Sequence, residues 1–190
     1  LVALGKKLPN TDWTGVTELK GIASEVAAIK AAIKVVDDAT VTNVTITSGQ
    51  ISAADANALA VASDGVVTAT IKDGSVAATL KALKDVDPAG TDVLTFKSTD
   101  KTADAKALVD LAALVTEDFS SVLTITSKAA DIGTNGANVT NALALGTVGD
   151  PAVTITNGTI SATNAGLIST ATNGKVTATI TPGEAADIAT

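Results

Sequence analysis

The strongest constraint on the fold of this chain is an internal repeat. Residues 44–74 align without gaps on residues 153–183, and 17 of the 31 paired positions are identical. The shared frame reads VTIT-x-G-x-ISA, then a helix-like stretch, then (D/N)G-x-VTATI-x-x-G. Two copies this similar predict the same fold in both, with two strands and one helix in each copy.

The strand pattern recurs between the copies in a looser form. Looser versions are Val93-Leu94-Thr95-Phe96 and Val122-Leu123-Thr124-Ile125-Thr126. The six predicted strands begin near Val44, Val67, Val93, Val122, Val153 and Val176. Their starts lie roughly 23 to 31 residues apart, a spacing typical of the coils of a solenoid.

Between the strands, the period of the apolar residues changes from 2 to 3.6, which predicts helices. Residues 102–115 carry one such apolar stripe, and residues 75–86 carry another. Helix starts are predicted by capping-type residues: Ser52 with Asp55, Ser161 with Asn164, Ser75, and Thr102. Helix ends are predicted at Asp64-Gly65 and Asn173-Gly174, where glycine would supply the left-handed conformation.

Strands that alternate with helices through short connections predict parallel pairing and right-handed crossovers. A doubly wound sheet is the alternative, but its strands are apolar throughout, whereas these alternate between apolar residues and threonine. The predicted fold is therefore α/β: a βα-repeat solenoid with a parallel sheet, helices on one face and a Thr-rich strand face on the other.

Three segments are expected along the chain. Residues 1–13 read as a linker or docking segment, and residues 14–40 as an amphipathic helix that caps the first coil. Residues 41–190 read as the βα-repeat solenoid, with about six coils. Within it, Ala129–Asp150 is irregular and predicts a loop at 133–136 and a short helix near 140–145. The chain lacks an initiator Met, so it is interpreted as a processed piece of something longer.

Composition argues against several functions. The chain has no His and no Cys, which removes the usual acid/base, thiolate and zinc chemistry, so no enzyme, cofactor or metal is predicted. The net charge of −7 is scattered, which argues against a nucleic-acid partner. No apolar run is long enough to predict membrane insertion.

Three further motifs have ordinary explanations. Asp85-x-Asp87-x-x-Gly90 is similar to the start of a calcium loop, but Phe96 stands where the bidentate Glu is needed, so a solvated turn at Pro88 is the favoured reading. Asp37-Asp38 is interpreted as a helix end. Glycosylation acceptor patterns begin at Asn43, Asn138 and Asn157, and chance matches are favoured in a chain rich in Asn and Thr.

The string Ile51-Ser52-Ala53-Ala54-Asp55-Ala56-Asn57-Ala58-Leu59-Ala60, followed by Gly65-Val66-Val67-Thr68-Ala69-Thr70-Ile71, resembles tandem βα repeats of very large bacterial, notably cyanobacterial, cell-surface proteins. The resemblance covers two blocks, about a third of the chain. It implies an extracellular or cell-surface location within a long polymer, and it transfers no catalytic residue.

The candidate functional residues are threonines that the alternation points away from the helices. They are Thr45, Thr47, Thr68, Thr70, Thr95, Thr124, Thr126, Thr154, Thr156, Thr177 and Thr179. Three roles are open: a solvated face, a packing interface with another copy, or recognition of glycan, ice or mineral. Val93 and Lys97 interrupt the array and argue against ice. The predicted function is a structural repeat segment that self-associates through repeat edges or the Thr face, as a homo-oligomer or with neighbouring repeats. The alternative is an adhesion module.

Overall fold

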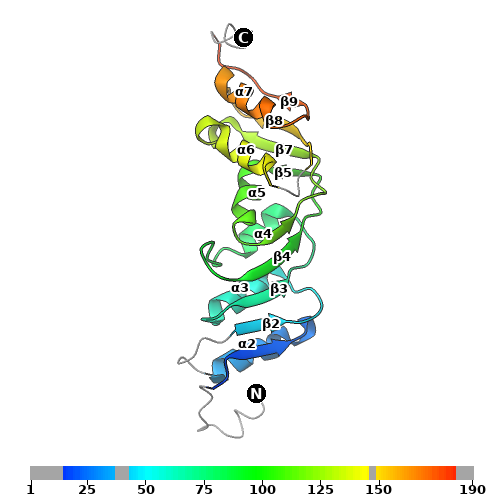
Figure 1. Cartoon of the computed structure of the whole chain (residues 1–190), viewed down its shortest axis with the longest axis vertical. Helices are drawn as coiled ribbons and strands as arrows, with labels where there is room; N and C mark the ends of the chain where they lie inside the picture. Colours follow the sequence, from blue (N-terminus) through cyan, green and yellow to red (C-terminus); the bar gives the residue numbers. More distant parts are fainter. Residues whose placement is uncertain (1–14, 37–42, 146–148, 183–190) are drawn as a thin grey trace. The chain divides into compact units, whose positions relative to one another are not determined.

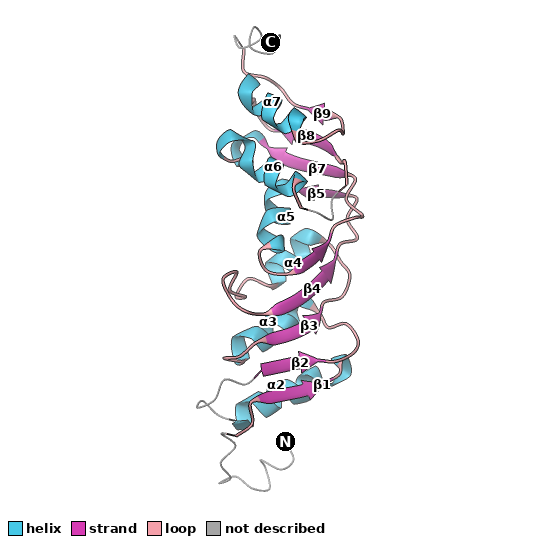
Figure 2. Cartoon of the chain, viewed as in Figure 1, coloured by secondary structure: helices cyan, strands magenta, loops and turns pink. Residues whose placement is uncertain are grey.

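The computed structural model describes residues 15–36, 43–145 and 149–182. This part of the chain is mixed α/β, with six α-helices and parallel strands in two sheets (Figures 1 and 2). The strands are β1 (Glu18–Gly21), β2 (Asn43–Ile46), β3 (Val67–Thr70), β4 (Val93–Lys97), β5 (Thr102–Asp104), β6 (Thr116–Asp118), β7 (Thr124–Lys128), β8 (Ala152–Thr156) and β9 (Val176–Thr177). The α-helices are α2 (Val26–Val36), α3 (Ala53–Ala62), α4 (Val76–Ala82), α5 (Ala105–Ala112), α6 (Ala137–Leu143) and α7 (Ala162–Thr170).

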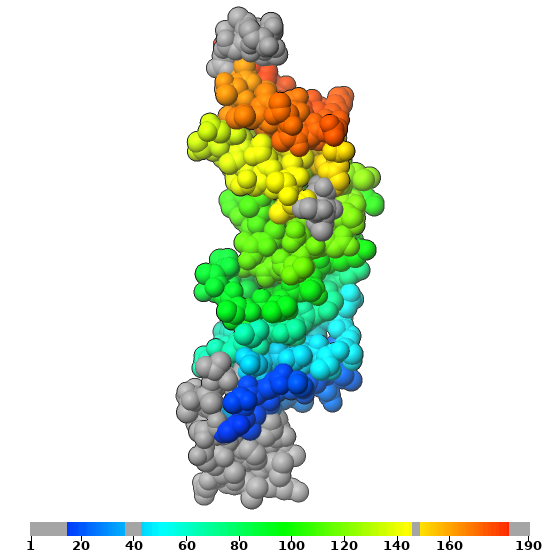
Figure 3. Space-filling model, in the orientation of Figure 1, coloured from blue at the N-terminus to red at the C-terminus, as the bar shows by residue number. Residues whose placement is uncertain are grey.

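The strands form a five-stranded sheet, ordered β1-β2-β3-β4-β6, and a four-stranded sheet, ordered β5-β7-β8-β9. The chain divides into two compact units whose segments interleave in sequence. The first comprises 1–72, 81–96 and 114–116, and the second comprises 73–80, 97–113 and 117–190. Within each unit, segments that follow one another in the chain are packed together, as the gradual colour change in Figure 3 shows.

In the first unit, apolar residues of neighbouring strands align and form the core. Leu19 pairs with Val44, Val44 with Val67, and Ala69 with Leu94. All five are buried. Helix α2 contacts both β1 and α3, so the core of this unit lies between strands and helices. Small and branched side chains fill it, because the chain has few aromatic residues to offer.

The second unit repeats this scheme. Ala103 pairs with Ile125, Ile125 with Val153, and Val153 with Val176. Helix α6 contacts both α5 and α7, and α5 and α6 each contact β7. The core residues Leu108, Leu111, Val139 and Ile168 come from these helices.

All six predicted strands are present, as β2, β3, β4, β7, β8 and β9, and each begins within two residues of its predicted start. The strands pair in parallel, as predicted. Strands β1, β5 and β6 were not predicted. Strands β1 and β5 lie in segments that were predicted to be helical.

The predicted amphipathic helix over residues 14–40 is wrong in its first half. Residues 18–21 form β1, a 3₁₀ turn follows at Ala23–Glu25, and α2 begins only at Val26. The apolar residues there fit either period, and pairing of Leu19 with Val44 selects the strand. Residues 37–40, Asp37 and Asp38 included, and the predicted linker at 1–13 lie outside the described residues.

The predicted helix starts are confirmed at three of four positions. The hydroxyl oxygens of Ser52, Ser75 and Ser161 accept hydrogen bonds from the backbone N–H three residues on, at 3.0, 3.2 and 3.1 Å. The start at Thr102 is wrong: residues 102–104 form β5, and Asp104 caps α5 by accepting the Ala107 N–H. Helix α4 ends at Ala82, before the predicted Val86. The predicted short helix in the irregular segment is α6, which begins at residue 137 rather than 140.

The predicted role of glycine at the ends of α3 and α7 is also wrong. The described glycines with positive φ are Gly49, Gly133, Gly136 and Gly158, and neither Gly65 nor Gly174 is among them. Instead, the hydroxyls of Ser63 and Thr172 accept the N–H groups of Gly65 and Gly174. A Cβ at Gly174 would lie 2.2 Å from the Pro151 carbonyl oxygen, so close backbone approach requires this glycine.

The two sequence copies fold alike, as the repeat predicts. The Ile51 N–H donates to the Thr70 carbonyl at 2.9 Å, and the equivalent Ile160 N–H donates to the Thr179 carbonyl at 2.9 Å. Ile51 also bridges to Ile71 as Ile160 bridges to Ile180. The two copies therefore share this hydrogen bond and this bridge, although the turn before them differs: Asn157 has a φ of 55°, whereas the equivalent Ser48 is not among the described residues with positive φ.

Candidate functional site: the threonines of the two sheets

The candidate threonines lie in two groups, one in each sheet. Thr45, Thr47, Thr68, Thr70 and Thr95 belong to the first unit, and Thr124, Thr126, Thr154, Thr156, Thr177 and Thr179 to the second. All of these threonines are half-buried or exposed. On β2, β3, β7 and β8, the apolar residue that lies between two threonines is buried. The predicted alternation is therefore confirmed on these strands.

Strand register brings several of these threonines side by side. In the first unit, Thr45 pairs with Thr68 and Thr70 with Thr95. In the second, Thr126 pairs with Thr154, which in turn pairs with Thr177. Paired residues of a parallel sheet project from the same face, about 4.8 Å apart. Each unit thus has a short row of threonines, interrupted in the first unit by Val93, which pairs with Thr68 and is 49% exposed.

Three of the threonine hydroxyls bond to the backbone of the preceding strand in the order of their sheet. Those of Thr47, Thr126 and Thr156 donate to the carbonyl oxygens of Gly21, Ala103 and Ser127 at 3.2, 3.3 and 3.4 Å. The Thr47 N–H also donates to the Gly21 carbonyl, at 2.8 Å. We call these three residues the stitching threonines, because each forms a hydrogen bond to the strand that precedes its own in the sheet order.

Two further hydroxyls bond to side chains. Thr45 donates to Glu18 Oε1 at 3.0 Å, and Thr95 donates to Thr70 Oγ1 at 3.1 Å. By contrast, Thr68, Thr124, Thr154, Thr177 and Thr179 have no hydroxyl partner within the described part of the chain. We call these five the free threonines.

An ion pair borders the threonine row of the first unit. Lys20, which pairs with Thr45, lies 2.9 Å from Glu18. Hydrogen bonds from Lys20, and then from Thr45, lower the pKa of Glu18 below its usual value. The row therefore ends at a carboxylate that stays ionised, rather than at an open edge of hydroxyls.

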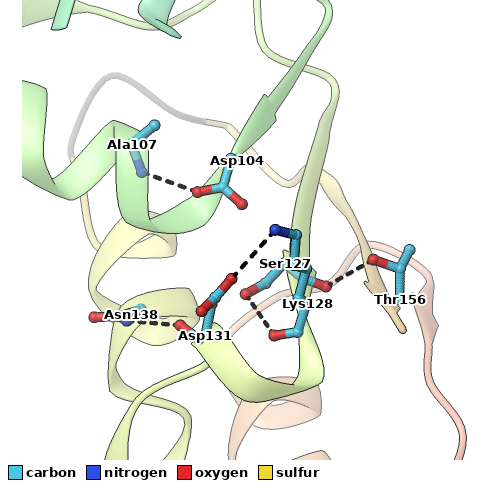
Figure 4. Close-up of polar contacts among 7 residues, drawn as sticks. All are labelled: Asp104, Ala107, Ser127, Lys128, Asp131, Asn138 and Thr156. Atoms are coloured by element: carbon cyan, nitrogen blue, oxygen red, sulfur yellow. Dashed lines mark hydrogen bonds and ion pairs between the residues drawn. The ribbon is translucent and has the colours of Figure 1, made fainter. Parts of the chain in front are cut away.

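Charged side chains border the second row as well (Figure 4). Asp104, which pairs with Thr126, accepts the Ala107 N–H at 3.1 Å and is occupied as a helix cap. Lys128, which pairs with Thr156, lies 3.9 Å from Asp131. The Asn138 amide donates to the Asp131 carbonyl at 2.7 Å. These polar groups bond to each other and leave no cluster aimed at a ligand.

Three polar devices, which are contacts between segments far apart in the sequence, were not predicted. Asp92 accepts the Val67 N–H at 2.8 Å, and Asp100 accepts the Val76 N–H at 2.8 Å. Asn57 and Asp85 exchange two hydrogen bonds. The partners lie 24 to 28 residues apart, one repeat period. Asp92 and Asp100 each lie one or two residues before a strand. An acidic residue in this position is the sequence signal that could have found these two contacts.

The Asp85–Gly90 segment forms the favoured turn. The Asp85 carboxylate accepts hydrogen bonds from Lys84 and from Asn57, and these bonds hold the pKa of Asp85 below its usual value. The Asp87 carboxylate accepts the Ala89 N–H at 2.9 Å. In the described residues, no three carboxylates come together as a metal site would need. Of the glycosylation patterns, Asn43 and Asn138 use their side chains in hydrogen bonds, and Asn157 lies in an exposed turn.

One open groove of about 480 Å³ lies in the second unit, beside the start of α7. No charged side chain lines it. The hydroxyl of Ser161, one of its polar residues, already accepts the backbone N–H of Asn164 as the cap of α7, at 3.1 Å. The groove therefore presents little chemistry for recognising a ligand.

No protein-family model, curated protein or solved structure matches this chain. Among the described helices, none has both the length and the apolar character needed to cross a membrane.

Proposed function

We propose that this chain is a structural repeat segment of an extracellular or cell-surface protein or filament. In this proposal the two sheets belong to a βα solenoid, with helices on one face and threonines on the other. It self-associates through repeat edges, the Thr face or both, and it carries out no catalysis.

The observation that carries the proposal is the bonding between segments 23 to 29 residues apart in the sequence. Backbone and side-chain bonds link residues about one repeat apart, including the three polar devices and the stitching threonines. Bonds of this kind hold each coil to its neighbour, which is how repeat proteins derive their stability. An enzyme concentrates its polar groups in one place instead.

Self-association draws support from the free threonines. Hydroxyls that bond to their own chain do not need a partner, whereas free ones on a β surface can meet another copy. Thr68 lies beside the exposed Val93, so apolar and polar groups are both available there. The same free hydroxyls also support the second candidate function, a module that binds glycan or another regular surface.

Substitution of free threonines tests the proposal. We expect the triple variant Thr68→Lys, Thr124→Lys, Thr154→Lys to fold, since surface changes typically alter stability by about 0.5 kcal/mol or less each. Its self-association should weaken in sedimentation velocity, because bulk and like charge enter the interface. A matched control carries Ala77→Lys and Ser169→Lys at exposed helical positions and Ala113→Lys at the exposed residue that follows α5, with the same added charge.

The outcomes separate the two functions. Weaker association of the threonine variant than of the control supports assembly through the Thr face. Unchanged association with lost binding on a glycan array, or lost shaping of ice crystals, supports the adhesion module instead. A parent chain that stays monomeric at high concentration would refute self-association altogether.

A further inference from the structure

The two copies of the repeat differ in how well their last strand is covered. In the first copy, Val67, Ala69 and Ile71 are 0%, 4% and 1% exposed. Their identical equivalents in the second copy, Val176, Ala178 and Ile180, are all half-buried. Since the sequences agree, the difference arises from the neighbours of these residues.

The first copy shows what covers this strand. Strand β4 pairs in parallel with β3, with Ala69 opposite Leu94 and Thr70 opposite Thr95. The Ile71 N–H donates to the Thr95 carbonyl at 2.8 Å, and the Val67 N–H donates to the Asp92 carboxylate at 2.8 Å. Both N–H groups therefore point away from β2 and toward β4.

In the second copy, no equivalent bonds are made within the described residues. The carbonyl oxygens of Lys175 and Thr179 accept the N–H groups of Val153 and Ile160. Lys175 and Thr179 lie at alternate positions of the strand, and their backbone polar groups therefore point toward β8 and the segment after it. Val176, Ala178 and Ile180 must then direct their N–H groups to the other edge. None of the three N–H groups has a partner there within the described residues, and β9 is the last strand of its sheet.

We propose that the free edge of β9 is an acceptor site for one more parallel strand, with the chemistry of β4. The occupant is an extended segment that carries an acidic residue, then an apolar residue two positions on, a threonine, and a second apolar residue, as in Asp92-Val93-Leu94-Thr95-Phe96. The carboxylate takes the Val176 N–H, and the threonine carbonyl takes the Ile180 N–H. The two apolar side chains cover Ala178 and Ile180. This inference rests on the proposed function. It names one strand edge through which the chain would associate and the sequence of the strand that this edge would bind.

Strand addition of this type gains affinity from main-chain hydrogen bonds and specificity from alternate side chains. A synthetic peptide with the sequence of residues 91–98, labelled with a fluorophore, is the probe. We expect saturable binding to the full chain by fluorescence anisotropy. A control peptide with Leu94→Lys and Phe96→Lys should bind at least about tenfold more weakly, since charged groups cannot cover the apolar edge.

Two measurements on the chain locate the site. Peptide binding should slow amide hydrogen exchange at Val176, Ala178 and Ile180. The variant Ala178→Pro removes one of these N–H groups and should abolish binding, while folding persists because that N–H makes no internal bond. Thr177→Val, on the same strand with its N–H kept, should bind the peptide like the parent chain.

Binding without slower exchange at these three amides, or binding that survives Ala178→Pro, would overturn the inference. Failure of the peptide to bind a chain that still self-associates would refute the acceptor edge and leave the proposed function standing. Peptide binding by a chain that never self-associates would refute self-association and leave the acceptor edge standing.

Discussion

Stitching threonines and free threonines should respond differently to loss of the hydroxyl. One triple variant replaces the stitching set, as Thr47→Val, Thr126→Val and Thr156→Val. The other replaces part of the free set, as Thr68→Val, Thr124→Val and Thr154→Val. Each variant changes one residue of the first unit and two of the second. Valine has nearly the shape of threonine, so the hydroxyl is the main difference.

The expected loss follows from the geometry of the three bonds. An internal hydrogen bond contributes about 0.5–1.5 kcal/mol net. The stitching bonds are 3.2, 3.3 and 3.4 Å long, and Thr47 and Thr156 are exposed, so the lower end applies. The triple variant should therefore lose about 1.5 kcal/mol, or roughly 3–6 °C in melting temperature for a chain of this size. The free set should change by no more than about 0.5 kcal/mol.

Thermal unfolding followed by calorimetry and by far-UV circular dichroism measures both effects. Urea unfolding checks the free-energy change at one temperature. Equal destabilisation by the two sets would refute the reasoning, since the hydroxyl bonds to the preceding strand would then contribute nothing. A larger loss in the free set would show that its hydroxyls do have partners.

Two more outcomes are expected. The pKa of Asp55 lies below its usual value of 3.8 because Lys30, and then Ser52, hydrogen-bond its carboxylate. This stabilisation is present above the unfolded pKa and is lost as the pH falls through the folded one, so Asp55→Asn should flatten the acid side of a melting-temperature profile from pH 6 to 2. A parallel profile for the variant and the parent chain would contradict this. Gly174→Ala should destabilise the fold by several °C, because its Cβ meets the Pro151 carbonyl, whereas Gly166→Ala in α7 has open space and should gain about 0.5–1 kcal/mol. Similar melting temperatures for the two glycine variants would argue against the close approach.

The sequence by itself determined the elements whose signals are local and long enough to read. The caps at Ser52, Ser75 and Ser161 follow from side chains that bond within one helical turn, and threonine alternates with buried residues on β2, β3, β7 and β8 because strand side chains have period 2. The likeness of the two copies predicted two strands and one helix in each, and both copies have them, as β2, α3 and β3 and as β8, α7 and β9.

Only the tertiary structure decided the features that depend on residues far away in the sequence. Residues 18–21 became β1 because Leu19 aligns with Val44, although their apolar pattern suits a helix too. The same contacts decided that the Thr47 hydroxyl bonds to the Gly21 carbonyl, whereas the Thr68 hydroxyl has no partner within the described residues. The division of the strands into two sheets likewise depends on which strands pair, because hydrogen bonds between parallel strands join residues far apart in the sequence. For the same reason, only the structure shows that β4 covers β3, whereas no described strand covers β9 in the same way.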